Sequence, residues 1–321
     1  MILDIVLLIV GFILLIKGAN IFVGESVNIS KKLKIPSVVI GLTVVSIGTS
    51  LPEAVVSITA SVKGANALAI GNIVGSNIFN LLFIVGLCAL IKPFMVNFKE
   101  IAKDLWIAAG AAAALLLIMV LCGDYITRPW SLVLFAAFMA YIIILVRNAT
   151  KNKEGDVSED SAEDGDTAAL KPLWKSIIGA VLGCAFIIAG GQLTVNGAEN
   201  IAVAMGISER LIGLTVLAIG TSLPELVTSL TACIKRENSI ALGNVVGSNI
   251  FNILFILGAA GMISPLAIDV NLIFDLIVLN VCSLVSIFFI YSGKKLVRFE
   301  GILMVAAYIG YMAFICVKDM I

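Results

Sequence analysis

Ten long apolar segments run through this chain and limit its possible folds more than any other feature. A helix needs roughly 20 apolar residues to cross a bilayer. Segments of about that length cover residues 2–23, 37–61, 67–91, 105–122, 130–147, 174–195, 210–233, 240–262, 271–291 and 299–317. Hydrophobic residues make up 60% of the chain and charged residues 13%, against about 45–50% and about 25% in soluble domains. We therefore predict an all-α integral membrane protein with ten transmembrane helices.

A polar linker at 149–172 divides these segments into two sets of five. It holds seven acidic residues between Glu154 and Asp166 and no aromatic residue, a composition typical of disordered linkers. We expect one five-helix repeat at 1–148 and a second at 173–321. The chain has no histidine, which excludes histidine-based acid–base catalysis and most zinc sites.

The two halves share a repeated sequence. Residues 41–80 align with 213–252 without a gap, and 27 of the 40 positions are identical. The loops that follow odd-numbered spans carry 16 lysines and arginines, whereas the opposite side carries 4. Because positive loops stay in the cytoplasm, we predict a multi-pass cell-membrane protein with both termini outside and the linker inside. A five-span repeat must then insert its second copy upside down, a plan typical of secondary transporters.

The segment Gly-Thr-Ser-Leu-Pro-Glu occurs in both repeats, inside an apolar span. Pro52 lacks an N–H and its ring clashes with the carbonyl of Gly48, so the span should break near 48–52. Carbonyls released at this depth need a partner, and a cation can serve. The half-helix that starts near Pro52 favours the negative charge of Glu53 through its dipole. The second copy, with Pro224 and Glu225, has the same properties.

Inverted repeats would bring Glu53 and Glu225 together near the bilayer midplane. Ionisable groups at this depth are costly and usually functional. The site would offer two carboxylates, four hydroxyls and several carbonyls, and Ca²⁺ takes roughly six to eight such hard oxygens. The four hydroxyls belong to Thr49, Ser50, Thr221 and Ser222. Without a cation the two carboxylates would repel each other, so we expect the site always to hold Ca²⁺, Na⁺ or protons.

A second repeated segment places polar side chains at i, i+4 and i+8 on one helix face. These stripes are Asn72, Ser76 and Asn80 in the first repeat, and Asn244, Ser248 and Asn252 in the second. Neutral oxygen donors suit a monovalent ion such as Na⁺ or the shaping of the site. The repeated glycines Gly71, Gly75, Gly243 and Gly247 lie four residues apart and permit close helix approach. Glu25, at the end of the first span, is expected in solvent, with attraction of cations as the alternative.

These paired segments resemble the two α-repeats of the cation/Ca²⁺ exchanger superfamily, in particular the prokaryotic sodium/calcium exchangers. The resemblance implies ten helices in two inverted repeats, with spans 2/3 and 7/8 broken, and alternating access. It implies Glu53 and Glu225 as central Ca²⁺ ligands, completed by Thr49 and Thr221. It implies flanking Na⁺ sites lined by Ser50, Ser222, Ser76, Ser248 and Asn80. Potassium-dependent members carry aspartate at the position of Asn252, which argues against K⁺ dependence here.

A sodium/calcium antiporter is therefore the predicted function, and an H⁺/Ca²⁺ antiporter with the same two glutamates is the alternative. The hydroxyl and amide stripes favour Na⁺, because protons need no such cage. A channel fits an occluded carboxylate pair less well, and an intramembrane hydrolase lacks a histidine or an aspartate dyad. We expect no enzymatic activity, no cofactor, no nucleic-acid partner, and a functional monomer in the lipid bilayer that transports Ca²⁺ and Na⁺ (or H⁺).

Overall fold

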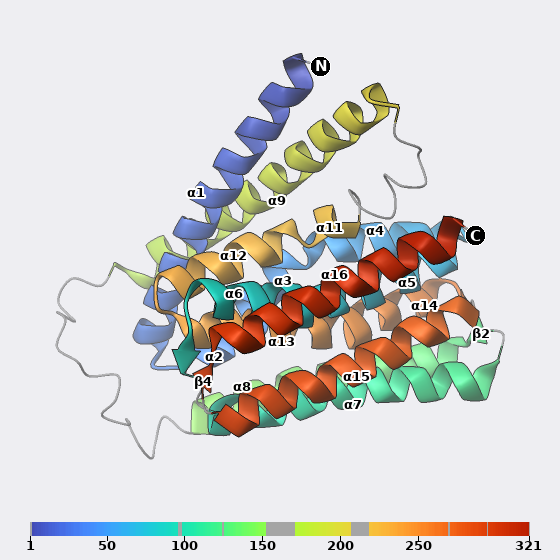
Figure 1. The fold of residues 1–321 in the computed structure, drawn as a ribbon. Helices are drawn as coiled ribbons and strands as arrows, with labels where there is room; N and C mark the ends of the chain where they lie inside the picture. Colours follow the sequence, from blue (N-terminus) through green and yellow to red (C-terminus); the bar gives the residue numbers. More distant parts are fainter. Residues whose placement is uncertain are drawn as a thin grey trace.

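The computed structural model describes residues 2–95, 98–123, 125–151, 171–206, 218–268, 270–293 and 295–320. Regular structure in these residues is helical apart from four two-residue strands (Figure 1). The first half contains α1 (Ile2–Leu33), α2 (Ser37–Ile40), η1 (Gly41–Val45), α3 (Ser46–Thr49), α4 (Leu51–Val62), α5 (Asn66–Ile78), η2 (Phe79–Ile84), α6 (Val85–Ile91), β1 (Phe94–Met95), α7 (Phe98–Cys122), β2 (Tyr125–Ile126) and α8 (Arg128–Lys151). The second half contains α9 (Leu173–Ala204), α11 (Ala218–Thr221), α12 (Leu223–Ile234), α13 (Asn238–Ile250), η6 (Phe251–Ile256), α14 (Leu257–Ile263), β3 (Leu266–Ala267), α15 (Val270–Gly293), β4 (Lys295–Leu296) and α16 (Arg298–Met320).

The described residues form eight helices long and apolar enough to cross a membrane, or nine when the bent pair Ser37–Thr49 and Leu51–Val62 counts as one span. The chain is thus a multi-pass membrane protein, as its hydropathy predicts. The expected span at 210–233 begins at residues outside the described part of the chain, since 207–217 are not described. Its described portion is α11 and α12.

The helix containing the first Gly-Thr-Ser-Leu-Pro-Glu segment bends by 50° between Thr49 and Leu51. The prediction of a break near 48–52 is therefore confirmed. Ser50 stands at the bend with φ −86° and ψ 9°, and Ser222 separates α11 from α12 with nearly the same angles, φ −91° and ψ 5°. Equal sequences thus produce equal local backbone geometry in the two halves.

The described part of the chain contains three π-helical segments, η1, η2 and η6, that the sequence did not predict. η2 and η6 each start directly after a Gly-Ser-Asn-Ile segment and occupy equivalent positions in the two repeats. A π-turn inserts an extra residue into a helix and is frequent at functional sites. The stripes of polar side chains therefore cross from an α-helical into a π-helical segment.

Short strands join the two halves of the chain. β1 pairs antiparallel with β4, and β2 pairs antiparallel with β3. In the interior, α13 crosses η1 so closely that a Cβ added to Gly243 would lie 3.0 Å from the Cα of Gly41. Close approach is thereby confirmed for Gly243, and for Gly247, whose added Cβ would lie 2.8 Å from Leu42 Cα. For Gly71 and Gly75 the equivalent partner segment, 213–218, falls almost wholly on residues outside the described ranges.

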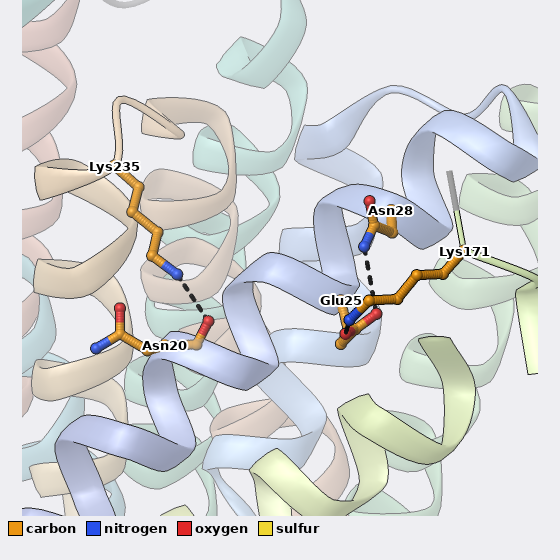
Figure 2. A network of polar contacts seen from close by, with 5 residues as sticks. All are labelled: Asn20, Glu25, Asn28, Lys171 and Lys235. Atoms are coloured by element: carbon orange, nitrogen blue, oxygen red, sulfur yellow. Dashed lines mark hydrogen bonds and ion pairs between the residues drawn. The ribbon is translucent and has the colours of Figure 1, made fainter. Parts of the chain in front are cut away.

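α1 and α9 lie side by side and lean away from the other helices (Figure 1). α1 continues to Leu33 instead of ending near residue 23, so Glu25 lies within the helix. The expectation that Glu25 is solvated is wrong. It is 7% exposed, forms an ion pair with Lys171 and accepts a hydrogen bond of 3.3 Å from Asn28 (Figure 2). Burial between two helices is possible because the ion pair compensates the charge.

Figure 2 also shows a link between α12 and α1. Lys235, directly after α12, donates a hydrogen bond of 2.7 Å to the carbonyl oxygen of Asn20. Lys171, at the end of the linker, and Lys235 therefore both attach to the same half of α1.

Candidate cation-binding site

The centre of the site is built on the two interrupted helices. Glu53 lies in the first turn of α4 and Glu225 in the first turn of α12, each directly after a proline at the first helical positions. Proline is favoured there because its missing N–H leaves no helical hydrogen bond unmade. The positive end of each helix dipole then faces the carboxylate. Both glutamates are completely buried, with 0% exposure.

Each glutamate is held by the serine at the other interruption. Ser50 donates a hydrogen bond of 2.6 Å to Oε1 of Glu225, and Ser222 donates one of 3.1 Å to Oε1 of Glu53. Neither serine caps its own helix. The two interrupted helices are therefore connected reciprocally through their carboxylates.

The serines of the second motif complete these two groups. Ser248 Oγ lies 2.9 Å from Ser50 Oγ, and Ser76 Oγ lies 2.9 Å from Ser222 Oγ. Ser76 is also 3.4 Å from Oε1 of Glu53. The structure thus brings together six of the residues that the sequence predicts for the site, as two equivalent groups. They are Glu53, Ser222 and Ser76 in one group, and Glu225, Ser50 and Ser248 in the other.

The predicted threonines adjoin these groups, but their hydroxyls have amide partners. Thr49 Oγ1 donates to Oδ1 of Asn244 at 3.0 Å, and Thr221 Oγ1 donates to Oδ1 of Asn72 at 3.3 Å. Asn244 Nδ2 in turn donates a hydrogen bond of 2.8 Å to Ser229 Oγ. Asn72 Nδ2 donates the equivalent bond to Ser57 Oγ of α4. Two members of the predicted stripes thereby support the threonines.

Asn80 and Asn252, the last members of the stripes, contact a layer of amides. Asn80 Nδ2 donates a hydrogen bond of 3.0 Å to Oδ1 of Asn249. Asn252 Nδ2 donates one of 3.0 Å to Oδ1 of Asn77. Asn252 Nδ2 also lies 3.4 Å from Ser76 Oγ, which joins the amide layer to the Glu53 group. Sequence reasoning assigned no role to Asn77 or Asn249, although both repeat identically in the two motifs.

Four buried oxygens at the site have no hydrogen-bond partner among the described residues. They are Oε2 of Glu53, Oε2 of Glu225, Oδ1 of Asn80 and Oδ1 of Asn252. Buried polar atoms are rarely left unpaired, because desolvation without a partner costs about 1–3 kcal/mol. Oxygens that accept and cannot donate are suitable ligands for hard cations. The described residues contain no group of three or more His, Cys, Asp or Glu side chains that could hold a metal ion.

A family model for sodium/calcium exchanger protein matches residues 3–147 and 175–317. The sodium/calcium exchanger MaX1 of Methanosarcina acetivorans is 34% identical over 343 aligned residues, which cover 95% of this chain and 96% of that protein. The inner membrane protein YrbG of Escherichia coli is 37% identical over 282 aligned residues, which cover 84% of this chain and 82% of that protein.

Among solved structures, the sodium-calcium exchanger NCX_Mj soaked with 2.5 mM Na⁺ and 0.1 mM Ca²⁺ matches with a TM-score of 0.84. The sequence identity is 33%, and the match covers 98% of each chain. The likeness therefore extends over both halves and includes both interrupted helices.

Proposed function

Because this chain belongs to the sodium/calcium exchanger family, we propose that it exchanges Ca²⁺ for Na⁺ by alternating access at the site formed by Glu53 and Glu225. The observation that carries this proposal is the pair of buried glutamates. Each has one oxygen held by the other motif's serine and one oxygen without a partner among the described residues. Two carboxylates carry a charge of −2, which one Ca²⁺ neutralises. The protein acts as a transporter and not as an enzyme.

In this proposal Ca²⁺ binds Oε2 of Glu53 and Oε2 of Glu225. The hydroxyls of Thr49 and Thr221 donate to amides but keep their oxygen lone pairs. Each threonine can therefore offer its hydroxyl oxygen or its backbone carbonyl to Ca²⁺. Such a flexible set of oxygens suits Ca²⁺ better than Mg²⁺, which requires a tight octahedron and keeps its water.

Na⁺ binds the neutral oxygens beside the glutamates. This set consists of the hydroxyls of Ser50, Ser222, Ser76 and Ser248 and the amide oxygens of Asn80 and Asn252. The unpartnered Oδ1 atoms of both asparagines support their assignment. A proton needs neither amide oxygens nor a ring of hydroxyls, so this donor set favours Na⁺ over H⁺ as the coupling ion.

We also propose that the two halves are inverted repeats and that the whole chain has ten transmembrane helices. Equivalent strands support this arrangement: β1 of the first half pairs with β4, and β3, its counterpart in the second half, pairs with β2. This exchange of partners is the one that a two-fold axis in the membrane plane would produce. The repeats are 1–148 and 173–321, both termini are extracytoplasmic, the linker 149–172 is cytoplasmic, and the monomer is the functional unit.

The decisive experiment measures radiolabelled Ca²⁺ uptake by purified protein in liposomes. An outward Na⁺ gradient and an outward proton gradient are applied separately. Uptake driven by Na⁺ alone would support the Na⁺/Ca²⁺ exchanger. Uptake driven by protons alone would retain the glutamate site, overturn Na⁺ coupling, and leave the serine and asparagine stripes a packing role.

A further inference from the structure

The amide layer between the two polar stripes has a hydrogen-bond pattern that determines which atoms face the site. Asn77 Nδ2 donates a hydrogen bond of 3.2 Å to the backbone oxygen of Asn249. Asn249 Nδ2 donates one of 3.3 Å to the backbone oxygen of Asn77. Both side chains are buried, with exposures of 0% and 2%. The two residues therefore form a reciprocal pair across the crossing of the two helices.

A backbone oxygen can only accept a hydrogen bond, so each of these amides must turn its Nδ2 toward the other residue's carbonyl. The Oδ1 of Asn77 then faces Asn252, and the Oδ1 of Asn249 faces Asn80. An oxygen in that position requires a donor, so Asn252 and Asn80 each present Nδ2 to it, at 3.0 Å in both cases. Their own Oδ1 atoms are consequently turned away from the layer, and these are the unpartnered oxygens.

Water cannot easily replace these partners. On another side Asn77 and Asn249 border a small cavity, and its lining is mainly apolar side chains of α7 and α15, including Leu105, Ala109 and Leu279. An amide that turned toward this cavity would lose its hydrogen bonds in a low-dielectric environment, which is costly. The orientation of all four amides is therefore set by two backbone carbonyls.

We propose that Asn77 and Asn249 are positioning residues, which hold the amide oxygens of Asn252 and Asn80 toward the transported Na⁺. This inference rests on the proposed function, in which those oxygens bind Na⁺. Asn77 and Asn249 touch no ion themselves. They prevent the two ligand amides from presenting an N–H group to a cation.

The test compares Asn249→Leu, Asn80→Leu and the double variant in liposomes. Half-saturating internal Na⁺ and half-saturating external Ca²⁺ are measured separately by radiolabelled Ca²⁺ uptake. Loss of a residue that orients a metal ligand typically weakens metal affinity about 10–100-fold. We expect Asn249→Leu to raise half-saturating Na⁺ by at least about tenfold while half-saturating Ca²⁺ stays close to that of the unmodified protein. The double variant should need no more Na⁺ than Asn80→Leu alone, because Asn249 acts through Asn80.

The matched control is Asn280→Leu. Asn280 is a part-buried asparagine of α15 that donates to the backbone oxygens of Leu276 and Ala112, outside the site. This variant should keep both half-saturating concentrations. The pair Asn77→Leu and Asn252→Leu repeats the test on the equivalent amide contact, and it decides the matter if Asn249→Leu does not fold.

Equal changes in the Na⁺ and Ca²⁺ dependence, or additive effects in the double variant, would overturn the positioning role and indicate a merely structural one. If Asn80→Leu raised half-saturating Na⁺ and Asn249→Leu did not, the positioning role would also be overturned. The proposed function would remain intact. Unchanged Na⁺ dependence in both Asn80→Leu and Asn252→Leu would instead refute the assignment of Na⁺ to these amides, and the positioning role with it.

Discussion

Replacing Glu53 with glutamine removes one charge from the centre of the site and leaves its contacts nearly intact. Oε1 accepts hydrogen bonds from Ser222 and Ser76, and the amide oxygen of glutamine can accept both. The new Nε2 takes the place of Oε2, which has no partner among the described residues. The variant should therefore fold, and any change in transport reports the lost charge.

The size of the effect follows from the charge balance. Ca²⁺ beside two carboxylates is neutralised, whereas beside one carboxylate it leaves a buried net charge of +1. At about 4 Å and an effective dielectric constant of about 20, one unit charge pair is worth about 4 kcal/mol, so a divalent ion loses about 8 kcal/mol. Part of this difference is offset, because in the unmodified protein Ca²⁺ must displace the protons or Na⁺ that two adjacent buried carboxylates otherwise hold. A net loss of about 4 kcal/mol weakens Ca²⁺ binding about a thousandfold.

The assay is radiolabelled Ca²⁺ uptake driven by a Na⁺ gradient, together with a thermal melt with and without Ca²⁺. Glu53→Gln and Glu225→Gln should each reduce uptake to the level of empty liposomes and abolish stabilisation by Ca²⁺. The matched control is Asp104→Asn. Asp104 is also a buried carboxylate in a membrane helix, but it accepts a hydrogen bond of 3.0 Å from Tyr141. The Asp104→Asn variant should transport Ca²⁺ normally. Normal Ca²⁺ transport by Glu53→Gln or Glu225→Gln would refute the central site.

Five other substitutions, one of them a control, test the remaining parts of the structure. Ser76→Ala and Ser248→Ala should raise half-saturating Na⁺ more than half-saturating Ca²⁺, whereas equal changes would place these hydroxyls in the Ca²⁺ site. In Gly243→Ala the new Cβ would lie 2.7 Å from a backbone oxygen of α2, so a thermal melt should show a loss of about 1–3 kcal/mol. Gly110→Ala, whose added Cβ would meet no other helix within 4 Å among the described residues, should show none, and an equal loss would contradict the close helix crossing. Lys171→Ala leaves the carboxylate of Glu25, which is 7% exposed, without its ion-pair partner. A thermal melt should therefore show a loss greater than the value of about 1 kcal/mol for an exposed pair, and an unchanged melt would show that the burial of Glu25 does not depend on the pair.

Local chemistry explains what the sequence could predict. Pro52 lacks an N–H and forces a break near its own position whatever surrounds it, and the 50° bend lies there. The same proline cannot donate to the carbonyl of Gly48, and this oxygen finds another partner in the thiol of Cys184, at 3.5 Å. The apolar length of the spans likewise depends only on composition, so the multi-pass character of the chain was predictable.

Contacts between distant segments explain what the sequence could not predict. The bond from Ser50 to Glu225 depends on the crossing of two helices and not on any spacing along the chain. Asn77 donates to the backbone oxygen of Asn249 in α13. η2 begins two residues after Asn77, and no proline or glycine marks the start of that π-helix. Glu25 is buried within α1 because Lys171, far along the chain, supplies the opposite charge.

The reciprocal bonds between serines and glutamates make the two interruptions interdependent. Ser50 stands at the bend between α3 and α4 but holds Glu225, and Ser222 stands between α11 and α12 but holds Glu53. A change of backbone angle at either serine therefore moves its hydroxyl relative to the opposite carboxylate. Since charge-assisted hydrogen bonds are stronger than neutral ones, such a movement has a cost that depends on what each carboxylate binds. In the proposed exchange, a cation bound at Oε2 of both glutamates would therefore act on both interruptions together, which a site built within one half of the chain could not achieve.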